Sequence, residues 1–246
     1  MARFTFLIIF TVLSLFCQGQ GDEIANNLKL ADTQFNLGNY TKSLTIIEDI
    51  LAMHPENLEA QEKKLNILMK LERSKDALAD IEEYIKLYPG QPVYYYLRAV
   101  ANLQNQKYTR AISDFNSCLD MNMPENALYK VYLNRGMAYF NIAEFELSEA
   151  DFNEALSRNS KSAAAYHGKG MVKYELNQFE EAVTVFKQSL QIDDSNAITH
   201  FNLAMAFFRL DDEENSCYHF NRSCALGHRN ACRLLLMECD VSIPGQ

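Results

Sequence analysis

Small and large apolar residues recur along most of the chain in columns with a period of 34 residues. One column of small residues consists of Ser43, Ala77, Ala111, Ser148, Ala182 and Ser216. The interval between Ala111 and Ser148 is 37 residues, which indicates a three-residue insertion that we place in the turn near Asn126 to Leu128. Self-similarity at such a period predicts stacked repeats rather than a domain built around one central core.

Two further columns keep the same register. Four residues after each small residue stand the large residues Ile47, Ile81, Phe115, Phe152, Phe186 and Phe220. Twelve residues before it stand Ala31, Leu65, Ala99, Gly136, Gly170 and Ala204, all small except the leucine. Small residues at a fixed offset predict two closely crossing helices in each repeat, because larger side chains would push the helices apart.

An aromatic residue often precedes the first small column by three positions, as at Tyr40, Tyr108, Phe145 and Phe179. This pattern, together with Pro55 and Pro89 at helix ends, resembles the tetratricopeptide repeat family. The resemblance implies an all-α, right-handed α-solenoid of helix-turn-helix repeats and covers residues 20–240. The expected repeats are 24–57, 58–91, 92–125, 129–162, 163–196 and 197–230, followed by a capping helix at 230–240 and a flexible tail at 241–246.

The first 19 residues have the layout of a signal peptide. Arg3 is basic, residues 4–16 are almost wholly apolar, and small residues precede a cut after Gly19. We therefore expect export to the periplasm, the outer envelope or the outside of the cell. An uncleaved anchor and lipid modification at Cys17 are the alternatives, although the apolar run is short for a membrane span. No further membrane span is expected after signal removal.

Four cysteines near the C-terminus are placed symmetrically about residue 228: Cys217, Cys224, Cys232 and Cys239. In an antiparallel helical hairpin Cys224 faces Cys232 and Cys217 faces Cys239, at a separation that permits disulfides. An exported protein meets an oxidising compartment, so we predict both bonds. Four buried thiols are the alternative, and the spacing matches no usual zinc site. Cys118 stands alone and is expected in the core.

Composition and motifs exclude several functions. The net charge is −9, from 23 basic and 32 acidic residues, and no basic cluster interrupts it, so nucleic-acid binding is not expected. No phosphate loop or nucleophile motif is present, and no histidine has a partner at metal-ligand spacing. We therefore predict no enzymatic activity, no metal and no cofactor.

The resemblance places the first helix of each repeat along an inner groove. In the C-terminal half this face carries methionines, aromatic residues and asparagines. They are Asn134, Met137, Phe140, Met171, Tyr174, Asn202, Met205 and Phe208. Methionine adapts to varied partners and asparagine amides pair with peptide backbone, so these residues are the predicted partner-binding site. The alternative is that they only pack adjacent helices.

The function predicted from these features is a protein-interaction scaffold or adaptor that binds a partner peptide or helix in the concave groove. The alternative is an accessory subunit of a cell-wall or glycan-handling envelope complex, with sugar stacked on tyrosines such as Tyr94, Tyr95 and Tyr96. The lysine and asparagine that some family members use to clamp a C-terminal carboxylate are absent. The sequence does not name the partner.

Overall fold

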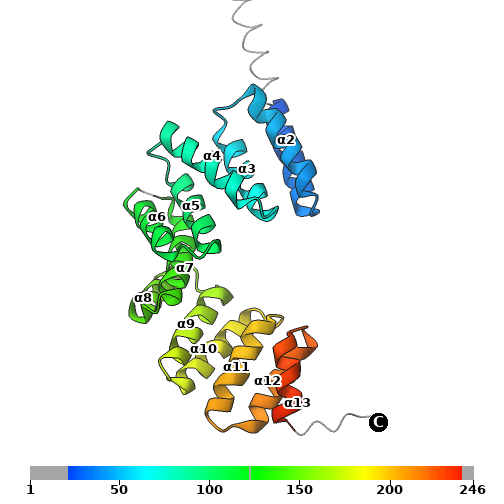
Figure 1. Cartoon of the computed structure of the whole chain (residues 1–246), viewed down its shortest axis with the longest axis vertical. Helices are drawn as coiled ribbons and strands as arrows, with labels where there is room; N and C mark the ends of the chain where they lie inside the picture. Colours follow the sequence, from blue (N-terminus) through cyan, green and yellow to red (C-terminus); the bar gives the residue numbers. More distant parts are fainter. Residues whose placement is uncertain (1–21, 122, 240–246) are drawn as a thin grey trace, which may run out of the picture. The chain divides into compact units, whose positions relative to one another are not determined.

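The computed structural model describes residues 22–121 and 123–239, and these residues form helices joined by short turns with no strand among them. The predicted signal peptide and tail lie outside the described residues. Residues 22–36 are helical. The helices that follow are α2 (Tyr40–Met53), α3 (Leu58–Lys70), α4 (Ser74–Leu87), α5 (Pro92–Gln104), α6 (Tyr108–Asp120), α7 (Glu125–Asn141), α8 (Phe145–Arg158), α9 (Ala163–Glu175), α10 (Phe179–Ile192), α11 (Ala197–Arg209), α12 (Glu213–Ala225) and α13 (Arg229–Glu238) (Figure 1).

Each range expected for a repeat contains a pair of helices, but the insertion lies elsewhere than predicted. Helix α7 has 17 residues, whereas α5 and α9 have 13. Residues 126–128 are helical, so the extra residues lengthen the start of α7 rather than its preceding turn. Pro124 stands immediately before the helix, where a missing backbone N–H costs nothing.

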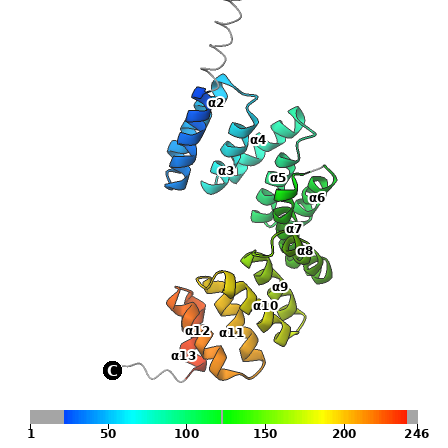
Figure 2. The ribbon, with the colours of Figure 1, turned by 180° about the vertical axis from the view of Figure 1, so that it is seen from behind.

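The chain divides into two compact units, residues up to Ala101 and residues from Asn102 onward. In the first unit Ile47, Ile50 and Leu68 belong to one buried cluster, and Leu65, Ile81 and Tyr94 to another. In the second unit α9 to α13 follow one another side by side, as the front and back views show (Figure 1 and Figure 2). Every large residue of the column from Ile47 to Phe220 is buried.

The small columns are contact points between helices. A Cβ added at Gly170 would lie 2.6 Å from Cδ1 of Phe186, and one at Gly136 would lie 3.0 Å from Cε1 of Phe152. The serines of the other small column also form hydrogen bonds. Ser148 donates to the carbonyl of Gly136 at 2.8 Å, and Ser43 and Ser216 make the equivalent bonds to Ala31 and Ala204. These positions therefore require small side chains, and in three repeats a serine hydroxyl forms a hydrogen bond between the two helices of the repeat.

The turn inside each repeat uses one left-handed residue. These residues are Gly38, Glu72, Gln106, Ala143, Asn177 and Asp211, with φ between 55° and 78°. The left-handed conformation lets the chain reverse between antiparallel helices, but it is strained for residues that carry a Cβ. Only the first repeat uses glycine at this position.

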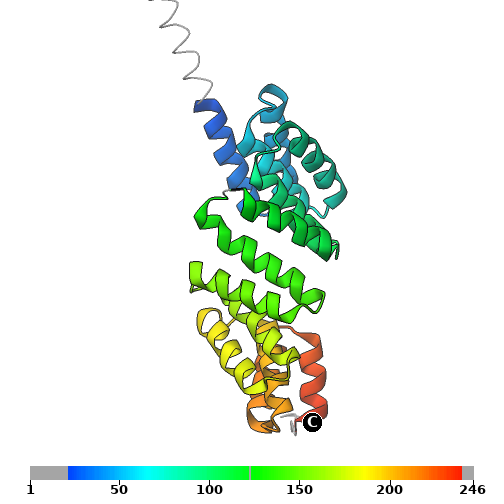
Figure 3. The same ribbon diagram turned by 90° about the vertical axis from the view of Figure 1, so that its left-hand side faces the viewer.

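Helices α12 and α13 form a hairpin held by two disulfides. The structure contains Cys217–Cys239 and Cys224–Cys232, with Cα atoms 5.8 and 4.7 Å apart. Figure 3 shows α13, in red, against α12. The capping helix begins and ends slightly earlier than predicted, at Arg229 and Glu238. Its leucines are also not all covered, because Leu236 is 65% exposed on the outer face.

Candidate partner-binding site

A hollow of about 180 Å³ lies on the surface of the second unit, between α9 and α11. Seven residues line it: Met171, Tyr174, Glu175, Phe186, Phe201, Asn202 and Met205. Met171, Tyr174, Asn202 and Met205 belong to the predicted site. Phe186, Phe201 and Glu175 were not predicted, since the sequence assigned only every third position of the first helix to the groove, and Phe186 belongs to the second helix of its repeat.

Helical spacing places these side chains together. Met171 and Tyr174 are three residues apart on α9, and Asn202 and Met205 are three apart on α11, so each pair shares one helix face. Phe186 enters from α10 and is fully buried. Its ring fits beneath α9 because Gly170 has no side chain. Packing against Gly170 thus fixes the position of the Phe186 ring in the hollow.

Met171 and Met205 both line the hollow and pack between adjacent helices, the two alternatives that the sequence left open. Met171 packs against the cluster that contains Phe186 and Phe207, and Met205 packs against the cluster that contains Phe220. Both remain partly exposed at the hollow. Methionine is flexible enough to repack around an incoming side chain without loss of the core contact.

The remaining predicted residues lie outside this hollow. Asn134, Met137 and Phe140 belong to α7, and Phe140 packs its ring 5.7 Å from that of Phe145 at the start of α8. Tyr174 makes the equivalent contact with Phe179 at 5.4 Å. The aromatic column therefore also packs the two helices within a repeat. Phe208 is different, because it is 45% exposed beside the end of α11.

The polar groups of the hollow are one amide and one carboxylate. Asn202 is partly exposed, and its side chain has no hydrogen-bond partner within residues 22–121 and 123–239. An unpaired amide beside an apolar hollow can donate to and accept from the backbone of an extended peptide. Glu175 is exposed at the rim.

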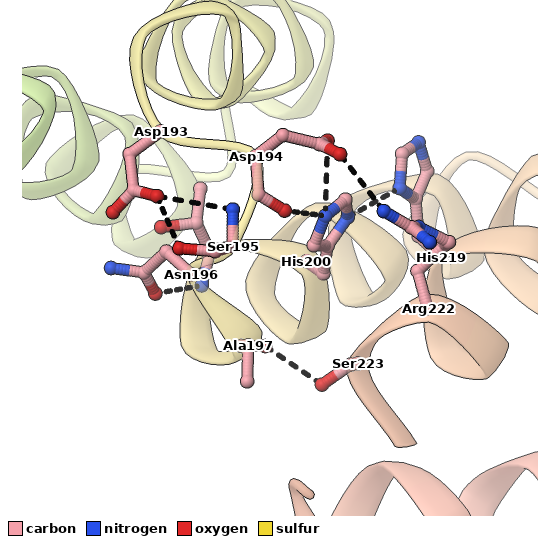
Figure 4. Close-up of polar contacts among 10 residues, drawn as sticks. Asp193, Asp194, Ser195, Asn196, Ala197, His200, His219, Arg222 and Ser223 are labelled. Carbon is pink, nitrogen blue, oxygen red and sulfur yellow. Dashed lines mark hydrogen bonds and ion pairs between the residues drawn. The ribbon is translucent and has the colours of Figure 1, made fainter. Parts of the chain in front are cut away.

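A histidine network stabilises the helices next to the hollow (Figure 4). His200 donates from Nε2 to the Asp194 carbonyl at 3.1 Å, and its Nδ1 lies 3.0 Å from Nδ1 of His219, within hydrogen-bond distance. Arg222 pairs with Asp194 at 2.8 Å. Burial, and to a smaller extent the neighbouring His200 and Lys187, lower the pKa of His219 to about 4, so His219 is neutral at pH 7. The network ties α12 to α11 and to the turn before it.

His167 plays a similar role between α9 and α11. Its Nδ1 lies 2.9 Å from the hydroxyl oxygen of Thr199 on α11. Burial lowers the pKa of His167 to about 4, so this side chain is also neutral at pH 7. No group of three or more metal-ligating side chains occurs in the described part of the chain. The contacts of these histidines join α9 to α11 and α11 to α12.

The tyrosines behind the glycan alternative do not form an open stacking surface. Tyr94 is fully buried and its hydroxyl donates to the side-chain oxygen of Gln61. The hydroxyl of Tyr95 donates to the Pro89 carbonyl at 3.1 Å, and Tyr96 packs against the buried cluster of Tyr94. No helix within the described ranges is both long enough and apolar enough to cross a membrane.

Sequence models of one family match most of the chain. A model described as TPR repeat matches residues 170–211, and models described as tetratricopeptide repeat match residues 28–92, 63–126 and 129–162. The helices and their 34-residue register agree with these matches. The chain belongs to the tetratricopeptide repeat family.

Solved structures with the same fold are distant in sequence. The Cut9–Hcn1 complex of APC/C contains a chain with a TM-score of 0.80 and 15% identity, covering 88% of this chain. Our chain spans only 43% of that protein's length. PilW, described as a widely conserved type IV pilus biogenesis factor, has a TM-score of 0.78 and 17% identity, with 87% and 98% of the two chains covered.

YrrB, described as a TPR protein with an unusual peptide-binding site, has a TM-score of 0.58 and 16% identity, with 76% of this chain and 96% of that chain covered. At these identities the similarities show a shared fold alone. No curated protein matches the sequence.

Proposed function

We propose that this protein is an exported scaffold that binds a segment of a partner protein in the hollow between α9 and α11. The observation that carries the proposal is the hollow itself, which combines methionine and aromatic walls with the unpaired amide of Asn202. Tetratricopeptide repeats support this general role, since stacked repeats present extended binding surfaces.

The size of the hollow favours a single anchoring side chain. Its volume of about 180 Å³ is close to that of an engineered cavity of about 150 Å³ that binds benzene. A leucine or phenylalanine of the partner would fill it, while the Asn202 amide pairs with the partner's backbone. Such an anchor, buried in an apolar pocket, is the kind of contact that dominates the affinity of protein interfaces.

Export is supported by two independent features. The N-terminal residues have the order of a signal peptide, and the C-terminal hairpin carries two disulfides, which persist in oxidising compartments. A scaffold of this kind would meet its partner outside the cytoplasm.

The test fills the hollow without changing the core. Asn202→Trp places a large side chain where the partner's anchor would bind, and Gln188→Trp makes the same kind of change at an exposed position of α10. Each variant is used for affinity purification from the producing organism, followed by mass spectrometry. We expect a protein captured by the wild type and by Gln188→Trp to be missing with Asn202→Trp, at equal helical circular dichroism.

Equal capture by both variants would show that the hollow is not the binding site. Recovery of polysaccharide without protein would support the glycan-handling alternative instead.

A further inference from the structure

A second hollow, of about 350 Å³, adjoins the exposed ring of Phe208 at the end of α11. Its lining contains three carboxylates from three different segments. Asp211 comes from the turn after α11, Glu213 from the first residue of α12, and Glu238 from the last residue of α13. We call this the acidic hollow.

The three carboxylates are not neutralised by the protein. All three are exposed, and none forms an ion pair with another residue within the described ranges. Glu213 has a local explanation, because an acidic residue in the first turn favours the helix dipole. Glu238, in contrast, lies at the C-terminal end of its helix, α13, where the helix dipole disfavours negative charge.

The nearest cation along the chain is engaged elsewhere. The guanidinium of Arg209 lies 4.3 Å from the ring centre of Phe179, and its Nη2 donates to the Asn177 side chain at 3.3 Å. Both partners belong to the preceding repeat. Arg209 therefore does not neutralise the carboxylates of the acidic hollow, which keeps an excess of negative charge.

The two hollows lie on opposite sides of α11, the first towards α9 and the second towards α13. Met205 lines the first and Phe208 the second, and a separation of three helical residues corresponds to a rise of about 4.5 Å. Measured from Asn202 the rise is about 9 Å. Neighbouring helices are about 8–10 Å apart, so the two hollows are about 9–13 Å apart. An extended peptide advances about 3.3 Å per residue, so three or four residues bridge the distance.

From this geometry we propose a partner of defined chemistry: a segment that places a leucine or phenylalanine in the α9–α11 hollow and, three or four residues away, a lysine or arginine in the acidic hollow. The inference rests on the proposed function and specifies its ligand. The cation meets three carboxylates and lies against the exposed face of Phe208, which also attracts positive charge.

The test uses short fluorescent peptides of glycine and serine that contain one leucine and, three or four positions before or after it, one lysine. Matched peptides carry Leu with Glu, or Ala with Lys. Binding is measured by fluorescence polarisation with the full chain. We expect the Leu–Lys peptides to bind about fivefold to tenfold more tightly than the Leu–Glu peptides, and the difference to shrink at high salt.

Two variants assign the effect to the site. Glu213→Gln with Glu238→Gln should remove most of the Lys-over-Glu preference. The control, Glu180→Gln with Glu181→Gln, makes the same charge change in the exposed first turn of α10 and should leave the Lys-over-Glu preference unchanged. Asn202→Trp should weaken the binding of both Leu peptides.

The outcomes separate the two proposals. If Leu–Lys and Leu–Glu peptides bind equally and Asn202→Trp weakens both, the binding hollow stands and the cationic partner is wrong. If Asn202→Trp has no effect on bound peptides, the proposed function itself is wrong.

The inference is also overturned if no Leu–Lys peptide binds at about 1 mM, a very weak affinity. It is overturned as well if a peptide of residues 240–246 displaces the probe, because the occupant is then the chain's own tail. Sedimentation could also show a dimer of the wild type that the Glu213→Gln, Glu238→Gln variant does not form. The occupant would then be a second copy of the chain, and the inference would again be overturned.

Discussion

Replacement of Gly170 by alanine tests the packing on which the binding hollow depends. The new Cβ would lie 2.6 Å from Cδ1 and Cε1 of Phe186, whereas carbon atoms in contact are about 3.5–4.0 Å apart. The Phe186 ring is fully buried, and the free space beside it is the hollow that it lines, so a shift of the ring would also change the hollow. Overpacking of this kind costs about 1–3 kcal/mol, while alanine in a helix regains about 0.5–1 kcal/mol over glycine.

The net expectation is a loss of about 0.5–2 kcal/mol of unfolding free energy. Urea denaturation followed by circular dichroism measures it, with Gly136→Ala as the matched control. At Gly136 the closest side-chain atom, Cε1 of Phe152, lies at 3.0 Å, so the clash is milder and the helix gain offsets more of it.

A double-mutant cycle assigns the effect to one contact. In a Phe186→Leu background the ring is absent, so Gly170→Ala should become neutral or stabilising, with a coupling energy of about 0.5–2 kcal/mol. A stabilising Gly170→Ala in the wild type, or additive effects of the two substitutions, would refute the helix contact described above.

Four other expectations follow from the structure. Reduction of the disulfides should loosen the α12–α13 hairpin before the other helices, with a loss of about 3 kcal/mol of unfolding free energy for the 22-residue loop. Hydrogen exchange should then show faster exchange of the hairpin amides, and equal protection of all helices after reduction would contradict this. The folded-state pKa values of His167 and His219 are about 4, below the ordinary 6.5, so the stability they contribute is complete above pH 6.5 and is lost as the pH falls towards 4. His167→Gln should flatten that slope by up to about 1.4 kcal/mol per pH unit, measured by urea titration at each pH. The same replacement at the partly exposed His219 should flatten it by less, because solvent screens the interaction. Ala143→Gly should raise the unfolding free energy by about 1 kcal/mol, because φ is 62° there, and a loss of stability would contradict the strain. N-terminal sequencing of the mature protein should begin at or near Gln20, and a soluble cytosolic chain that retains Met1 would contradict export.

The local and periodic features of this protein follow from its sequence. Each repeat must bury the same small and large columns against its neighbours, so a 34-residue register leaves a recognisable pattern from Ala31 to Phe220. The cysteine pairing is of the same kind, since reflection about residue 228 in a helical hairpin brings Cys224 to Cys232. Both inferences need only helix geometry and nearest-neighbour packing.

Side-chain choices between helices required the tertiary structure. The sequence treats Met137 and Met171 as equivalent, yet of the two only Met171 lines this hollow. The repeat after Met171 contributes Phe201 and Asn202, where the repeat after Met137 has His167 and Gly168. Similarly, nothing in the order of residues pairs His200 with His219 or shows that Glu238 lies beside Asp211. The sequence determined the repeat, because each repeat solves the same packing problem, whereas three-dimensional contacts between non-equivalent residues decided where an open, charged binding surface remains.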